Sequence, residues 1–102
     1  MSPEKLVRDR IPEILANAGR MVPVRRSDPS SRRHLLLAKL QEEAAEARDN
    51  LCLEELADVL EVLHALAGEL THPWEDVEKE RARKREERGA FHEGWVLTLP
   101  ED

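Results

Sequence analysis

Residues 32–70, RRHLLLAKLQEEAAEARDNLCLEELADVLEVLHALAGEL, combine two helical apolar patterns with the densest acidic charge in the chain. On a helical wheel, positions 36, 40, 44 and 47 fall within about 80° of one another, and positions 51, 62 and 66 form a similar stripe further on. Asp49 and Asn50 favour a break, with Asn50 as the N-cap of the following helix. The stretch predicts two consecutive helices, one beginning near Arg32 and one running from Leu51 to about Leu70.

Shorter signals on both sides predict two more helices. Pro12 suits the first turn of a helix that runs to about Ala18, and Gly19 suits its end. Pro73 precedes a fourth helix at 74–88, which Gly89 ends. Residues 95–99 are a candidate strand that could pair with an extended segment at 21–26. We therefore expect one domain over residues 1–102, an all-α bundle of about four helices with short terminal β-strands as a candidate addition.

The composition limits both the core and the setting of the protein. At 102 residues with 3% aromatic content, the core must be small and aliphatic, so burial against a second copy should help and a homodimer or homotetramer is expected. The single cysteine, Cys52, excludes an internal disulfide and disfavours a thiolate zinc site. The longest apolar stretch, 56–70, is interrupted by charge, and residues 1–10 lack the apolar core of a signal peptide. We expect no membrane span, a cytoplasmic setting and, at a net charge of −6, no stable nucleic-acid binding.

The acidic charge is organised into two pairs. Residues 42–61 contain eight acidic side chains and one basic one, so this segment accounts for the whole negative charge of the chain. Glu43 and Glu46 are three residues apart, as are Glu55 and Asp58, and this spacing places both members of a pair on one side of a helix. Like charges packed between two helices are unfavourable unless a cation neutralises them. Carboxylate oxygens are hard ligands that suit Mg²⁺, with Mn²⁺ as a substitute.

A magnesium site of this kind indicates a substrate that carries phosphates. Lys39 beside the first acidic pair, and Lys84 and Arg88 four residues apart in the fourth predicted helix, are the candidate phosphate-binding cations. One carboxylate could serve as general base, and the sequence leaves open which one. Arg8 has two interpretations: a role near the phosphates, or an ion pair that holds the N-terminal segment to the bundle.

Four segments carry a resemblance to a known family: KLVRDRIP at 5–12, KLQEEAAE at 39–46, EELADVLEV at 54–62, and Lys84 followed by RGAF at 88–91. The chain resembles the MazG-like, all-α nucleoside triphosphate pyrophosphohydrolases, and within them a small branch similar to phosphoribosyl-ATP pyrophosphohydrolase. Ala90 departs from the pattern, because the branch usually has a second glycine there. The resemblance implies Mg²⁺-dependent cleavage between the α and β phosphates of a nucleotide, with release of the monophosphate and pyrophosphate. It assigns the metal-binding and catalytic positions to Glu43, Glu46, Glu55 and Asp58.

Two alternatives to a house-cleaning enzyme for noncanonical nucleoside triphosphates stay open. One is hydrolysis of phosphoribosyl-ATP in histidine biosynthesis, which uses a related bundle. The other is a non-catalytic interaction module whose acidic hairpin docks a basic partner. The preferred base and sugar and the number of metal ions are not fixed by the sequence.

Overall fold

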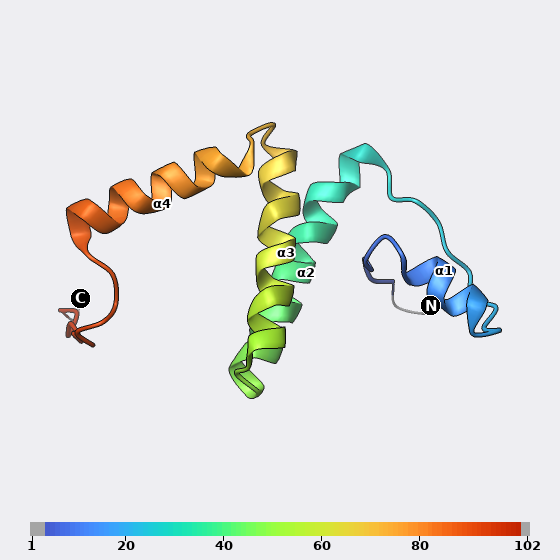
Figure 1. The fold of residues 1–102 in the computed structure, drawn as a ribbon, viewed down its shortest axis with the longest axis horizontal. Coiled ribbons are helices and arrows are strands. Elements are labelled where there is room, and N and C mark those ends of the chain that lie inside the picture. The colour runs from blue at the N-terminus through green and yellow to red at the C-terminus, as the bar shows by residue number, and fades with distance from the viewer. Residues whose placement is uncertain (1–3, 101–102) are drawn as a thin grey trace.

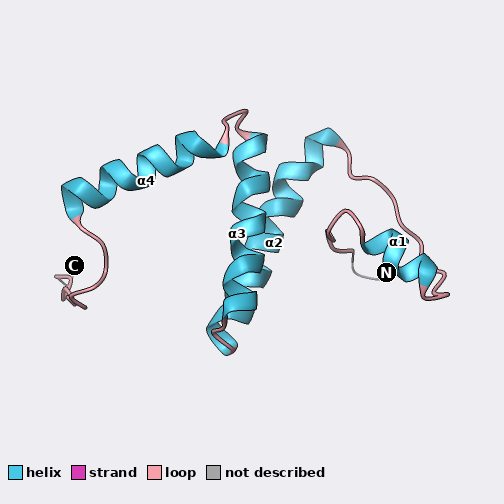
Figure 2. Ribbon diagram, viewed as in Figure 1, coloured by secondary structure: helices cyan, strands magenta, loops and turns pink. Residues whose placement is uncertain are grey.

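Four helices make up the regular structure of the chain (Figure 1). The computed structural model describes residues 4–100, in which α1 spans Ile11–Asn17, α2 Pro29–Asp49, α3 Leu53–Glu69 and α4 Trp74–Arg88. The all-α prediction is confirmed. The predicted terminal strands are wrong, since Figure 2 shows only helix and loop in the described residues. Residues 21–26 and 95–99 lie at opposite ends of the molecule, so neither has a neighbour with which to form a sheet (Figure 1).

The centre of the fold is an antiparallel hairpin of α2 and α3, which pack along their length (Figure 1). Leu36 of α2 and Val62 and Ala67 of α3 are the buried hydrophobic side chains of the described residues. Glu43 is buried with them at 7% exposure, as its place at the edge of the apolar stripe predicts. This charged side chain sits inside a very small core, so the hairpin has little apolar burial to stabilise it.

Two predicted boundaries need correction. Helix α2 begins at Pro29, three residues before the predicted start, because proline fits the first helical position and Ser31 Oγ donates a hydrogen bond to the Asp28 carbonyl at 3.1 Å. Asn50 is not the N-cap of α3. It ends α2, where its N–H donates to the Glu46 carbonyl at 3.0 Å, and α3 starts only after the extended residue Cys52.

The outer helices match their predicted ends more closely. Glycines with positive φ, Gly19 at 76° and Gly89 at 83°, follow α1 and α4 as expected. The Trp74 ring stacks on His64 of α3 with centroids 3.8 Å apart, which anchors the start of α4. Beyond that contact α4 projects away from the hairpin, and among the described helices α1 packs against none (Figure 1).

The result is an open arrangement rather than a closed bundle. The radius of gyration is 17.8 Å, whereas a compact chain of this length has about 13 Å. Within residues 4–100, none of the helices has the length and apolar character that a membrane span requires.

Candidate metal centre

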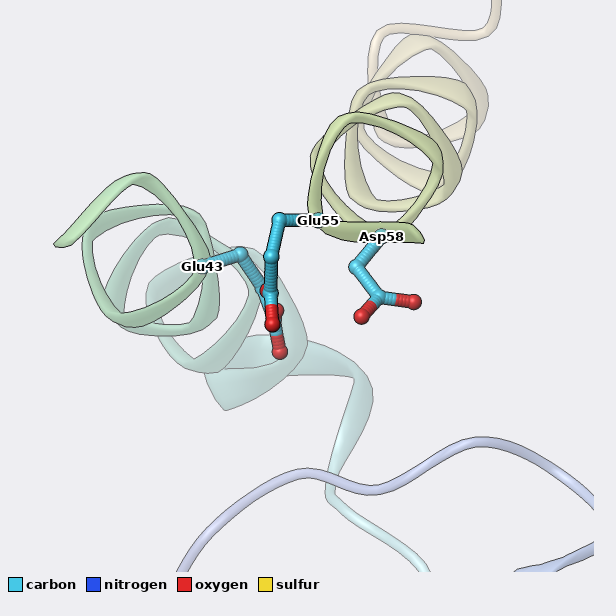
Figure 3. A group of neighbouring side chains, drawn as sticks. All are labelled: Glu43, Glu55 and Asp58. Carbon is cyan, nitrogen blue, oxygen red and sulfur yellow. The ribbon is translucent and has the colours of Figure 1, made fainter. Parts of the chain in front are cut away.

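Three of the predicted metal ligands converge on one side of the helical hairpin. Glu43 comes from α2, and Glu55 and Asp58 come from one turn of α3 (Figure 3). One carboxylate oxygen from each lies within 4.8 Å of the others. The i, i+3 spacing of the α3 pair and the antiparallel packing of α2 bring these groups together from positions up to fifteen residues apart.

The charges of these three carboxylates are unequally compensated. Lys39 Nζ lies 3.1 Å from Glu43 Oε1, and Arg8 Nη2 donates to Asp58 Oδ1 at 2.7 Å. Glu55 has no basic partner among the described residues. In addition, Glu43 Oε2 and Glu55 Oε2 are buried atoms without a hydrogen-bond partner. Two buried, unsatisfied anionic oxygens are unfavourable in a folded protein and are suited to a cation.

Glu55 carries the clearest electrostatic signature of the group. Partial burial, followed by repulsion from Glu46, Asp58 and Glu43, raises the pKa of the Glu55 carboxyl above its ordinary value of 4.5. Both causes disfavour the charged form, so Glu55 gains more from a nearby cation than an isolated surface carboxylate would.

Glu46, the fourth predicted ligand, lies apart from this convergence. Its side chain is exposed, one turn after Glu43 on α2, and it is not among the three residues whose oxygens meet. It nevertheless lies near enough to Glu55 to raise the pKa of that carboxyl. Glu46 therefore adds negative charge at the rim of the cluster.

The predicted phosphate-binding cations are placed very differently from one another. Lys39 lies at the site, where its ammonium contacts Glu43 at 3.1 Å and Glu42 at 3.4 Å. Partial burial opposes the charge of Lys39, but these two carboxylates outweigh it and raise its pKa. Lys84 and Arg88 are exposed on α4, which extends away from the hairpin, so a single chain does not bring them to the carboxylates (Figure 1).

Two further cations reach this region from the N-terminal segment. Arg8 pairs with Asp58 and also approaches Glu61 at 3.7 Å, which favours the interpretation of Arg8 as a tether for this segment. Lys5, to which the sequence assigned no role, pairs with Glu42 at 3.4 Å. Together with Lys39 it lines a recess of about 140 Å³ between the N-terminal segment and α2. Only the position of Lys5 within the family-like opening segment could have drawn attention to it.

The size of the cluster is compatible with a divalent cation held by oxygen ligands. Opposite ligands lie about 4.2 Å apart around an octahedral Mg²⁺ ion and about 5 Å apart around Ca²⁺. The three carboxylate oxygens of the cluster lie within 4.8 Å of one another. Small side-chain rotations would therefore bring the ligands into range. Together with the two unpartnered buried oxygens, this geometry makes the three carboxylates a candidate group for a divalent cation.

Comparison with known proteins adds no assignment. No protein-family model, no curated protein and no solved structure matches this chain.

Proposed function

We propose that this protein is a Mg²⁺-dependent nucleotide pyrophosphohydrolase that works on a nucleoside triphosphate, with a noncanonical nucleotide as the favoured substrate. The observation that carries the proposal is the convergence of Glu43, Glu55 and Asp58, two of which have a buried oxygen without a hydrogen-bond partner. The nucleotide and the bond that is cleaved come from the resemblance of segments 5–12, 39–46, 54–62 and 84–91 to the MazG-like family.

The residues divide into two roles under this proposal. Glu43, Glu55 and Asp58 would hold the cation, with Glu46 as an outer carboxylate that adds to the negative potential. When bound, Mg²⁺ would supply charge neutralisation at the phosphates and a bound water of lowered pKa. Lys39, whose ammonium lies 3.1 Å from Glu43, and Lys5, which lines the neighbouring recess with it, would be the cations that meet the phosphate oxygens.

Pyrophosphate release in the presence and absence of Mg²⁺ tests the proposal directly. Glu55→Gln and Asp58→Asn should abolish release, since each removes one charged ligand while keeping the side-chain shape. Glu54→Gln is the matched control, because Glu54 is exposed, is adjacent in sequence and lies outside the convergent group. Full activity in both site variants would refute the assignment of these ligands.

The substrate panel decides between the related enzymatic activities. It should contain normal and damaged nucleoside triphosphates together with phosphoribosyl-ATP. A strong preference of the protein for phosphoribosyl-ATP would indicate the histidine-biosynthetic reaction instead. If no substrate is cleaved and neither Mg²⁺ nor Mn²⁺ binds, the acidic hairpin is better described as an interaction surface. Calorimetric titration with MgCl₂ separates that outcome from an active site whose substrate was missing from the panel.

A further inference from the structure

The N-terminal segment at residues 4–10 lies across the open side of the carboxylate cluster. Lys5 Nζ lies 3.4 Å from Glu42 Oε1 on α2. Arg8 Nη2 donates a hydrogen bond to Asp58 Oδ1 on α3 at 2.7 Å. Figure 3 shows the carboxylate oxygens of the cluster pointing toward this segment, the pale blue-violet tube. The segment therefore places one cation on each helix of the hairpin, and we call residues 4–10 the N-terminal strap.

Few contacts hold the N-terminal strap to the hairpin. Leu6 is half-buried and lines the recess with Leu35 and Ala38 of α2, whereas the other side chains of the strap are exposed. Helix α1, which follows the strap, packs against none of the other described helices. Among the hydrogen bonds and ion pairs of the described residues, those of Arg8 are the ones that join the strap to α3. Arg8 is therefore the tie at the second end of the strap.

The strap neutralises only the outer part of the carboxylate cluster. Asp58, which accepts from Arg8, has a side chain that is 30% exposed. Glu43 is buried at 7% exposure, and its Oε2 atom has no hydrogen-bond partner although the strap is in place. Glu55 Oε2 is buried and unpartnered in the same way. A cation among the three carboxylates would reach these two inner oxygens, which the strap does not.

Asp58 is the carboxylate that the strap and a divalent cation would both use. It pairs with Arg8 at 2.7 Å, and one of its oxygens lies within 4.8 Å of oxygens from Glu43 and Glu55. A cation held by the three carboxylates would draw on the charge of Asp58 and would repel the nearby guanidinium. Glu42, the partner of Lys5, is outside this group of three. The conflict is therefore confined to the Arg8 end of the strap.

We propose that the N-terminal strap is a built-in competitor of the divalent cation, so that cation binding releases Arg8 from Asp58 while Lys5 stays on α2. This inference rests on the cation site of the proposed function and not on the nucleotide that is cleaved. Binding free energies are reciprocal, so the cation weakens the strap by the same factor by which the strap weakens cation binding. The Arg8 and Asp58 side chains are 54% and 30% exposed, and for such a pair we expect a factor of about two to five.

Backbone ¹⁵N relaxation of the full chain measures the release of the strap directly. In saturating MgCl₂ at matched ionic strength, the order parameters of residues 7–9 should fall from the values of the metal-free protein to below about 0.6. Arg8→Ala should lower them without any divalent cation. Arg10→Ala is the matched control, because Arg10 pairs with Glu13 of α1 at 3.5 Å and not with the hairpin. It should behave as the wild type does, and equal loss of order in both variants would overturn the role of Arg8.

Glu43→Gln separates occupation of the site from general screening of the ion pairs. It removes one cation ligand and leaves the partners of Lys5 and Arg8 unchanged, so its strap should stay ordered in MgCl₂. Loss of order equal to that of the wild type would mean that screening releases the strap, which would overturn the proposal. Circular dichroism of each variant verifies that the helices are intact.

Calorimetric titration of the same samples with MgCl₂ distinguishes failure of this proposal from failure of the proposed function. If Mg²⁺ binds the wild type and residues 7–9 keep their order, the strap does not compete with the cation, and the cation site stands. If Mg²⁺ does not bind, the cation site and the competition both fail. A strap that is already mobile in the metal-free wild type would also overturn the proposal.

Discussion

Replacing Glu43 by glutamine should separate the electrostatic cost of the carboxylate cluster from the benefit of a bound cation. Glu43 is the only buried charged residue in the described part of the chain, and its Oε2 atom has no hydrogen-bond partner there. Glutamine keeps the volume and removes the charge. Without a divalent cation, the substitution loses the attraction to Lys39, which lowers the free energy of unfolding, and relieves the repulsion from Glu55 and Asp58, which raises it.

The distances give the size of these two contributions. The attraction between Glu43 and Lys39 at 3.1 Å corresponds to about 1.3 kcal/mol in water and about 5 kcal/mol at an effective dielectric constant of 20. The repulsion from Asp58 at up to 4.8 Å is about 0.9 to 3.5 kcal/mol on the same scale, and Glu55 adds to it. With Glu55 at a similar distance the total repulsion is about 1.7 to 7 kcal/mol, so it slightly exceeds the attraction and the free energy of unfolding should change by less than about 2 kcal/mol in EDTA.

Mg²⁺ should then distinguish the two proteins clearly. At ten times its dissociation constant, a ligand that binds only the folded state adds about 1.4 kcal/mol, which raises the Tm of a domain of this size by about 6 to 11 °C. Glu43→Gln should show a nearly flat response over the same concentrations, whereas Glu54→Gln should follow the wild type. Circular dichroism melts at matched ionic strength measure this without interference from general screening. An equal rise in wild type and Glu43→Gln would refute the reasoning.

Three other changes have defined outcomes. Arg8→Ala should raise the affinity for Mg²⁺ severalfold in calorimetry, because it frees Asp58 from an ion pair at 2.7 Å; an unchanged or weaker affinity would show that Arg8 does not compete with the cation. Leu36→Ala should lower the free energy of unfolding in urea by about 2 to 5 kcal/mol, whereas Leu99→Ala, exposed by 74%, should change it by less than about 0.5 kcal/mol. Burial and neighbouring carboxylates raise the pKa of Glu55. Above that pKa the charged Glu55 side chain destabilises the metal-free fold. As the pH falls toward 4.5, Glu55 becomes protonated and the destabilisation disappears. The stability difference between Glu55→Gln and wild type should therefore shrink from pH 7 downward, and a difference that grows would contradict the direction of the shift.

Local sequence signals were sufficient for most helix ends but not for the reversal between α2 and α3. Pro73 and Gly89 fix α4 because each acts through its own backbone, and Gly19 does the same after α1. Asn50 has the chemistry of an N-cap but serves as the end of α2, since an antiparallel reversal uses residues 50–52 before α3 can begin. A propensity for capping does not say which of two adjoining helices a residue will cap.

The candidate site was predictable to the extent that it depends on helical spacing. The i, i+3 pairs and the apolar stripe place Glu43, Glu55 and Asp58 at the seam, where the structure brings their oxygens together. The partners Arg8 and Lys5 could not be assigned in this way, because Arg8 is fifty residues from Asp58 and no periodic pattern connects them. Lys84 and Arg88 were predicted to bind phosphate because their spacing places them on one face of α4. Their spacing does not say where α4 packs, and in the structure α4 extends away from the carboxylates.

The carboxylate cluster on α2 and α3 poses an energetic problem for the small core. Among residues 4–100 the core has three buried apolar side chains, and it must also hold a buried carboxylate next to two others. Few stabilising contacts are available to offset that repulsion. A divalent cation held by the three carboxylates would remove this repulsion, so its binding should stabilise the fold.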